Sequence, residues 1–229
     1  MNIEETLRDQ YQGKDSGYFQ AERYEMLRYV PPGSHTILDV GCGSGNFSRL
    51  LKKSRPAEVW GVELDKEAAA IAASKLDRVI CGAFDSKLQL PDQSFDCVIF
   101  NDVLEHMVDP FSALVYAKTL FRDGGVLVAS IPNVRYFVTM WDLLVHRDWK
   151  YADWGVLDRT HLRFFTCRSI ISTFTDLGYQ VKSIEGINPI ENVHPELVSK
   201  FRFFNRLLFN GIEDMRYLQF AVVAYPQKS

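Results

Sequence analysis

The chain has 229 residues, of which 47% are hydrophobic, and a formal net charge of -3. This length can bury one large core, so a single domain over residues 1–229 is favoured over two domains. The small negative charge gives no reason to expect a nucleic-acid partner. Neither a signal peptide nor an apolar run of about 18 residues is recognisable, so we expect a cytoplasmic protein without a membrane span.

The first predicted element is a helix in an N-terminal cap, residues 1–30. Phe19, Arg23 and Met26 lie on one face of this helix, and the Pro-Pro-Gly sequence of residues 31–33 would end it.

The next element is a strand-to-helix turn that contains three glycines. An apolar strand precedes Gly41, Gly43 and Gly45, and apolar residues at helical spacing follow them. Glycine permits unusual backbone angles and lets a ligand approach the main chain. The spacing differs from the dinucleotide fingerprint, and no Gly-Lys-Ser/Thr follows as a phosphate loop requires. Asp39 would place a carboxylate at the mouth of the turn, which suits a cationic ligand better than a pyrophosphate.

The string LDVGCGSG at residues 38–45 resembles motif I of the class I S-adenosylmethionine-dependent methyltransferases. The resemblance implies S-adenosylmethionine as the cofactor and S-adenosylhomocysteine as its product. It implies an α/β, Rossmann-like fold: seven mostly parallel strands, strand seven antiparallel, and helices on both faces. It also implies that the N-terminal cap covers the cofactor, with Tyr11, Tyr18 and Phe19 as candidate lining residues, although aromatic residues at helical spacing are more often core.

Two further segments carry candidate cofactor contacts. Glu63 ends the second strand, where a carboxylate can accept both hydroxyls of a ribose; its alternative role is a solvated loop charge. In the third strand and its loop, residues 79–86, Ala83 stands where the family commonly has an acidic residue. Phe84 could stack on an adenine ring and Asp85 could accept from its amino group, but either could equally face solvent. The full set of cofactor-binding candidates is Asp39, Gly41, Cys42, Gly43, Gly45, Glu63, Leu64, Phe84, Asp85 and Asn101.

The segment after the fourth strand, residues 102–110, contains two carboxylates and an imidazole. Asp102, Glu105 and His106 are spaced so that a helical turn would place them on one side, where they could hold a divalent metal. Ubiquinone-pathway and RNA 3′-end methyltransferases look alike here with Glu in the first position. The same segment also occurs in relatives that need no metal, so we expect no metal site.

The acceptor region is expected in two insertions, residues 134–165 and 188–217. The first is crowded with aromatic side chains, which suggests a lid that excludes water. Asn133, at the end of the fifth strand, is a candidate to orient the acceptor or a turn residue. His161 is a candidate general base, because its ordinary pKa of about 6.5 suits proton transfer near neutral pH, or a structural hydrogen-bonding residue. Arg159 and Arg163 could bind an anionic acceptor group or pair with nearby carboxylates.

The Ile-Pro-Asn string of residues 131–133, the aromatic insertion and DRTHLRFFT at residues 158–166 resemble a bacterial subgroup associated with methylation of surface glycans and other small molecules. This resemblance implies O-methylation of a small molecule or glycan precursor. N-methylation of a small molecule and, from a more distant likeness to MetW-like proteins, a non-catalytic S-adenosylmethionine-binding regulator are the alternatives. The second insertion carries an apolar stripe that suits a lid or a homodimer contact.

Overall fold

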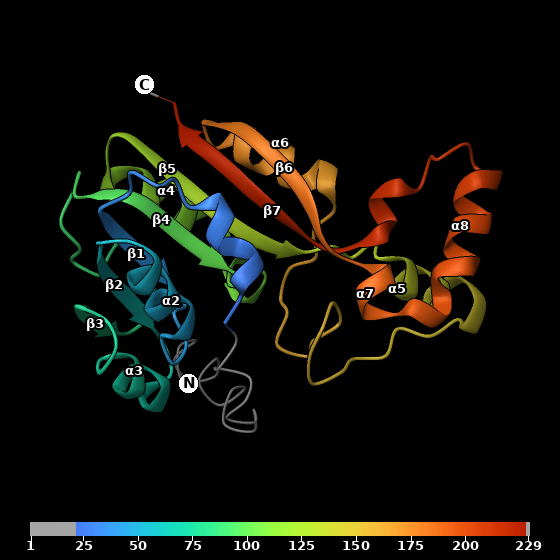
Figure 1. Ribbon diagram of the computed structural model, residues 1–229, viewed down its shortest axis with the longest axis horizontal. Helices are drawn as coiled ribbons and strands as arrows, with labels where there is room; N and C mark the ends of the chain where they lie inside the picture. The colour runs from blue at the N-terminus through green and yellow to red at the C-terminus, as the bar shows by residue number, and fades with distance from the viewer. Residues whose placement is uncertain (1–21, 228–229) are drawn as a thin grey trace.

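A seven-stranded sheet forms the centre of the computed structural model, which describes residues 22–227 (Figure 1). The strands are β1 (Thr36–Val40), β2 (Glu58–Glu63), β3 (Arg78–Cys81), β4 (Phe95–Asn101), β5 (Phe121–Pro132), β6 (Tyr179–Pro189) and β7 (Tyr217–Pro226). Their order is β3-β2-β1-β4-β5-β7-β6. The first five strands pair in parallel, and β7 runs antiparallel to both β5 and β6. The predicted fold, including its antiparallel last strand, is confirmed.

Helices cover both faces of this sheet because alternate side chains of each strand point to opposite sides. Leu38 packs in one apolar cluster with residues of α4 (Pro110–Leu120) and α6 (Cys167–Asp176). Its neighbour Ile37 packs in a second cluster with residues of η2 (Tyr24–Tyr29), α2 (Asn46–Ser54) and α3 (Lys66–Ala72). β4 is buried along most of its length, as expected of a parallel strand covered on both sides.

The two insertions form one lobe beside the sheet, at the right of Figure 1. Its elements are α5 (Phe137–Trp141), η4 (Asp142–His146), α7 (Ile190–Val193), η5 (Pro195–Leu197), α8 (Val198–Leu207) and η6 (Glu213–Arg216). The ring of Phe137 meets that of Phe201 at 5.5 Å between centroids, so side chains of both insertions share one apolar cluster. Trp154, which was expected in a lid, is 70% exposed.

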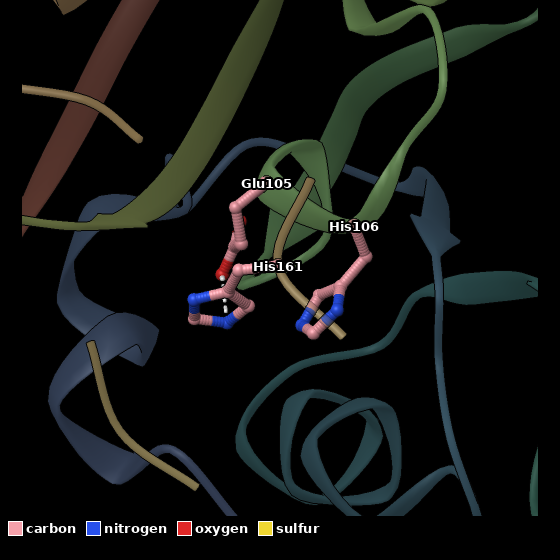
Figure 2. Close-up of side chains that lie close together, drawn as sticks. All are labelled: Glu105, His106 and His161. Carbon is pink, nitrogen blue, oxygen red and sulfur yellow. Dashed lines mark ion pairs between the residues drawn. The ribbon is translucent and has the colours of Figure 1, made fainter. Parts of the chain in front are cut away.

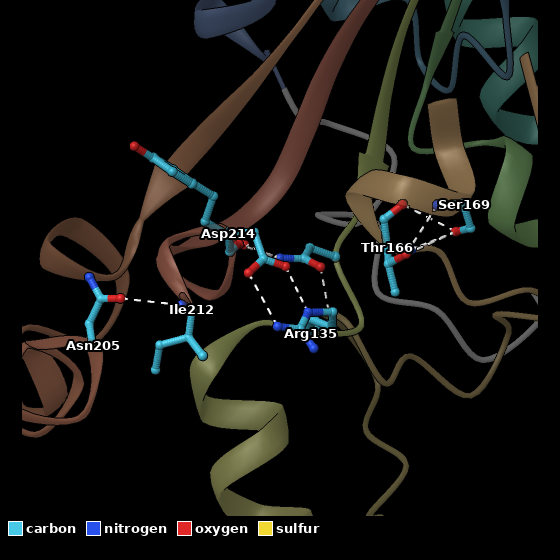
Figure 3. Close-up of polar contacts among 8 residues, drawn as sticks. Arg135, Thr166, Ser169, Asn205, Ile212 and Asp214 are labelled. Carbon is cyan, nitrogen blue, oxygen red and sulfur yellow. Dashed lines mark hydrogen bonds and ion pairs between the residues drawn. The ribbon is translucent and has the colours of Figure 1, made fainter. Parts of the chain in front are cut away.

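Polar contacts tie the lobe to the end of β5 (Figure 3). Arg135 Nε and Nη2 lie 2.7 and 3.3 Å from the two carboxylate oxygens of Asp214, so the pair is bidentate and joins the two insertions. Thr166 and Ser169 form a capping box at the start of α6, because each side chain accepts a hydrogen bond from the other residue's backbone N–H.

Not every helix and strand begins or ends at the residue that the sequence predicted. The N-terminal helix appears among the described residues only as the short 3-10 helix η2, and Tyr11, Tyr18 and Phe19 lie outside the described residues. β3 ends at Cys81, and the predicted loop follows it. β5 follows α4 directly and ends at Pro132, just before Asn133, as expected. Among residues 22–227, no helix is both long and apolar enough to cross a membrane.

Candidate active site

A cavity of about 660 Å³ opens where β1, β2 and β4 end. Nine of the ten predicted cofactor residues line it: Asp39, Gly41, Cys42, Gly43, Glu63, Leu64, Phe84, Asp85 and Asn101. Parallel strands present their carboxyl ends at this edge, which is where ligands bind in open α/β sheets. The exception is Gly45, which is the left-handed residue before α2. A Cβ there would lie 3.2 Å from Ala72 of α3, so this glycine serves helix packing.

The glycine turn is shaped as a cradle. Gly41 and Gly43 have φ values of +68° and +52°, in the left-handed region that favours glycine. A Cβ on Gly41 would lie 2.5 Å from Cγ2 of Val103, so no side chain fits there. The turn therefore keeps its main chain open to the cavity.

Glu63 fixes the cradle to the next strand. Its carboxylate accepts hydrogen bonds from the backbone N–H of Gly43 at 2.7 Å and of Asp65 at 2.8 Å. Burial raises the pKa of Glu63, and the backbone donors oppose this shift. The residue is buried and not the solvated loop charge that the sequence left open.

Asp39 is a buried carboxylate in the cavity wall. The hydroxyl of Ser48 donates to it at 2.6 Å, yet burial raises the pKa of Asp39 to about 7, with Glu63 adding to the shift. A cation placed beside such a buried carboxylate stabilises its ionised form. Cys42 next to it has a pKa raised by burial, so its thiol stays protonated.

Asn101 and the β3 loop complete this part of the cavity wall. Both polar side-chain atoms of Asn101 are buried without a hydrogen-bond partner in the described part of the chain. A polar ligand in the cavity could form the hydrogen bonds that this side chain lacks. The ring of Phe84 is buried against Phe100 and Tyr116, and Asp85 accepts from the backbone N–H of Lys87. With the glycine cradle and Glu63, these features fit a nucleoside-containing ligand.

The cavity also holds a cluster of Glu105, His106 and His161, shown in Figure 2. Glu105 and His106 belong to the short helix η3 (Leu104–His106), and His161 comes from the end of the first insertion. The backbone N–H groups of Leu162 and Arg163 both donate to the carbonyl of Glu105, at 2.8 and 3.1 Å. These bonds hold His161 beside Glu105, with Nε2 3.9 Å from Oε1.

Asp102 takes a different place from the one that the sequence suggested. It lies before η3 with φ +54°, so it does not share a helical turn with His106. Its carboxylate is held by Arg23, by Ser130 at 2.9 Å and by Gln219 at 2.9 and 3.0 Å. The expected grouping of Asp102 with Glu105 and His106 is therefore wrong, because the cluster contains His161 in its place.

Asn133 lies outside the residues that line the cavity. Its amide nitrogen donates to the carbonyls of Asp214 and Tyr217, and its amide oxygen accepts from the N–H of Arg135. These bonds fit the role of Asn133 as a turn residue better than a role in orienting the acceptor. The two candidate arginines also have local contacts: Arg159 pairs with Asp153 at 2.9 Å, and Arg163 donates to main-chain carbonyls.

Sequence reasoning missed Arg23 and Gln219 as lining residues of the cavity. They come from the two ends of the described chain and meet at Asp102, and Arg23 also donates to the side-chain oxygen of Gln219 at 3.4 Å. No local motif marks either residue, so the sequence held no signal for them.

The profile of the methyltransferase domain family matches residues 11–184. The chain therefore belongs to the class I S-adenosylmethionine-dependent methyltransferase family. It is 30% identical over 166 residues to the ubiquinone biosynthesis O-methyltransferase of Aeromonas salmonicida. The aligned region covers 68% of this chain and 68% of that one. It is 38% identical over 113 residues to an uncharacterized methyltransferase of Schizosaccharomyces pombe, 44% of this chain and 40% of that one.

A third relative is a trans-aconitate 2-methyltransferase of Escherichia coli, 29% identical over 122 residues, or 51% of this chain and 48% of the relative. Several curated relatives are thus matched over less than half of their length. Among solved structures, a SAM-dependent methyltransferase of Archaeoglobus fulgidus has a TM-score of 0.66 at 20% identity, with 97% of this chain and 99% of that chain covered. This likeness supports the fold.

Proposed function

We propose that the protein transfers the methyl group of S-adenosylmethionine to an oxygen atom of a small molecule or glycan precursor. One observation carries the proposal: the cavity that contains the glycine cradle and Glu63 also contains a buried carboxylate and two imidazoles. A site that only senses a cofactor has no need of proton-accepting groups beyond it. The names of the relatives from Aeromonas salmonicida and Escherichia coli support small-molecule methylation.

The chain's own residues have separate tasks in this reaction. Glu63 would hold ribose hydroxyls, the glycine turn would admit the cofactor's main body, and Asp39 would stabilise its positive charge. The bound cofactor supplies an electrophilic methyl group on a sulfonium, which leaves as the neutral thioether. Positioning the acceptor oxygen against that methyl group supplies most of the rate enhancement in such a displacement.

His161 is the residue that we propose accepts the proton of the acceptor hydroxyl. Its Nδ1 lies 2.9 Å from the carbonyl oxygen of Val156, which can only accept, so Nδ1 carries a proton. The neutral ring then has its lone pair on Nε2, the nitrogen on the side of Glu105. Glu105 would stabilise the imidazolium that forms.

The lobe is proposed to enclose the acceptor, within a single methyltransferase domain spanning residues 1–229. Gly155, Val156 and His161 of the first insertion line the cavity, and so do Leu218 and Gln219 just after the second. The first insertion and the start of β7 thus border the space in which an acceptor would meet the methyl group. Water exclusion by such segments strengthens electrostatic interactions within the site.

The experiment is to incubate the purified protein with methyl-labelled S-adenosylmethionine and a lysate of its source. Label is then counted in small-molecule, lipid or glycan, protein and nucleic-acid fractions. We expect label in the small-molecule or glycan fraction, bound through oxygen, and a loss of turnover in His161→Ala with cofactor affinity retained. Cofactor binding without label in any fraction would contradict the proposal and favour the regulatory alternative.

A further inference from the structure

The cluster of Glu105, His106 and His161 has the composition of a metal site. One donor atom from each residue, two imidazole nitrogens and a carboxylate oxygen, can be chosen so that all lie within 4.8 Å of one another (Figure 2). Two histidines and one carboxylate form a recurring ligand set for first-row divalent cations, including catalytic Zn²⁺ and non-haem Fe²⁺. All three residues line the cavity, so further coordination positions would face an acceptor or water.

Both histidines are oriented by their Nδ1 atoms. The Nδ1 of His161 donates to the carbonyl of Val156. His106 Nδ1 lies 3.2 Å from the carbonyl oxygen of Thr160 and 3.0 Å from its hydroxyl oxygen, and that hydroxyl gives its own proton to Asp158 at 2.8 Å. Both Nδ1 atoms therefore carry protons in the neutral rings, and each Nε2 has the lone pair. A backbone carbonyl behind the other ring nitrogen is the usual outer support of a metal-ligating histidine.

Glu105 supplies an independent observation. The residue is 1% exposed, and neither of its carboxylate oxygens has a hydrogen-bond partner among the described residues. The guanidinium of Arg23, which lines the same cavity, pairs with Glu25 at 2.8 Å and with Asp102. A buried carboxylate without hydrogen bonds is costly unless a cation compensates it.

We infer that Glu105, His106 and His161 bind a first-row divalent cation, with Zn²⁺ and Fe²⁺ as the best-fitting ions. With metal–ligand bonds of about 2.0–2.2 Å, two ligands of a tetrahedral ion lie roughly 3.4 Å apart, so a pair of donors 4.8 Å apart would have to close by roughly 1.4 Å. The pair formed by Glu105 Oε1 and His161 Nε2 is already 3.9 Å apart. This inference replaces the sequence-based expectation of no metal.

The inferred site rests on the proposed function and changes one step of it. The ion would hold the acceptor's hydroxyl oxygen and lower its pKa, so that the proton passes to solvent. His161 would then be a ligand and not the proton acceptor. The acceptor oxygen forms its bond to the methyl carbon as the carbon–sulfur bond breaks, with the electron pair kept by sulfur.

The test measures metal binding directly. The full chain is stripped with EDTA, dialysed, and titrated by calorimetry with Zn²⁺, with Co²⁺, and with Mg²⁺ as a harder ion that suits imidazole poorly. The same titrations are made on Glu105→Gln and His161→Gln. His194→Gln is the matched control, because His194 pairs with Glu196 at 3.1 Å at the surface of the lobe. Circular dichroism and S-adenosylhomocysteine affinity verify that each variant is folded.

We expect one Zn²⁺ or Co²⁺ per chain. Glu105→Gln and His161→Gln should each lower that affinity by at least ~100-fold, since loss of even an outer-shell partner typically costs ~10–100-fold. His194→Gln should bind as the unchanged protein does. Absence of Zn²⁺ and Co²⁺ binding, or unchanged affinity in folded Glu105→Gln, would overturn the inference. Methyl transfer that persists in stripped protein would also overturn it while leaving the proposed function intact, whereas stoichiometric metal binding with no methyl transfer would reject the function alone.

Discussion

Asp39→Asn tests whether this buried carboxylate recognises the cofactor's positive charge. Burial raises the pKa of Asp39 from its ordinary value of 3.8 to about 7. In the cofactor-free protein, roughly one molecule in ten then has an ionised Asp39 at pH 6 and roughly nine in ten at pH 8. Asparagine has nearly the same shape, can still accept from Ser48, and has no charge at any pH.

The expected magnitude follows from these populations. If the cationic cofactor binds the ionised form, the affinity of the unchanged protein should rise roughly tenfold from pH 6 to pH 8. The cofactor's own α-amino group titrates near about 7.7–8.0, but this contribution is common to both proteins. The difference between the two pH profiles therefore isolates Asp39.

Stability should change in the opposite direction. The folded-state pKa of Asp39 is above its unfolded value, so this group lowers the free energy of unfolding as pH rises from about 4 to about 7. Above that window the penalty is fully present, and Asp39→Asn should stabilise the cofactor-free protein at pH 8 by at most about 4 kcal/mol. Calorimetric titration with S-adenosylmethionine and urea unfolding at pH 6, 7 and 8 measure both effects. An Asp39→Asn variant whose affinity at pH 8 equals that of the unchanged protein would refute the reasoning.

Three further substitutions separate the cradle from the lobe. Glu63→Gln replaces one of two carboxylate acceptors by a donor that faces a backbone N–H. We expect the free energy of unfolding in urea to fall by ~1–3 kcal/mol and calorimetry to show weaker cofactor binding. Unchanged cofactor affinity would remove Glu63 from the site. Gly41→Ala adds a Cβ 2.5 Å from Val103 at a positive φ and should cost at least ~1–2 kcal/mol and most of the cofactor affinity, whereas tight binding would contradict the cradle. Arg135→Met breaks a partly exposed pair with Asp214, so stability should fall by no more than ~1 kcal/mol while limited proteolysis of the lobe accelerates and cofactor affinity stays constant. A fall in affinity there would show that the lobe and the cofactor site are coupled.

The cofactor side of the site could be predicted because its signals are local. The glycine spacing at residues 41–45 and the acidic end of the second strand each fit within a few residues, and parallel strands bring such ends to one edge. Asp39 was placed correctly for the same reason. Neither its raised pKa nor the backbone bonds of Glu63 could be derived, since both depend on packing around the turn.

The acceptor side depends on contacts between distant segments. His161 meets Glu105 because the chain after the insertion returns to η3 and donates to the carbonyl of Glu105. No periodicity in the sequence predicts this contact between His161 and Glu105. The helical spacing of Asp102 was misleading, since a positive φ before η3 turns it toward Ser130 and Gln219. Single-sequence patterns predict which face a residue occupies within one element, not which loop covers it.

A crystal structure of the protein with S-adenosylhomocysteine bound would test the central claim most directly. The account predicts the ribose hydroxyls within hydrogen-bonding distance of Glu63, the main body of the ligand over Gly41 and Gly43, and the sulfur on the side of Glu105 and His161. A ligand bound elsewhere, or one whose sulfur points away from that cluster, would contradict it.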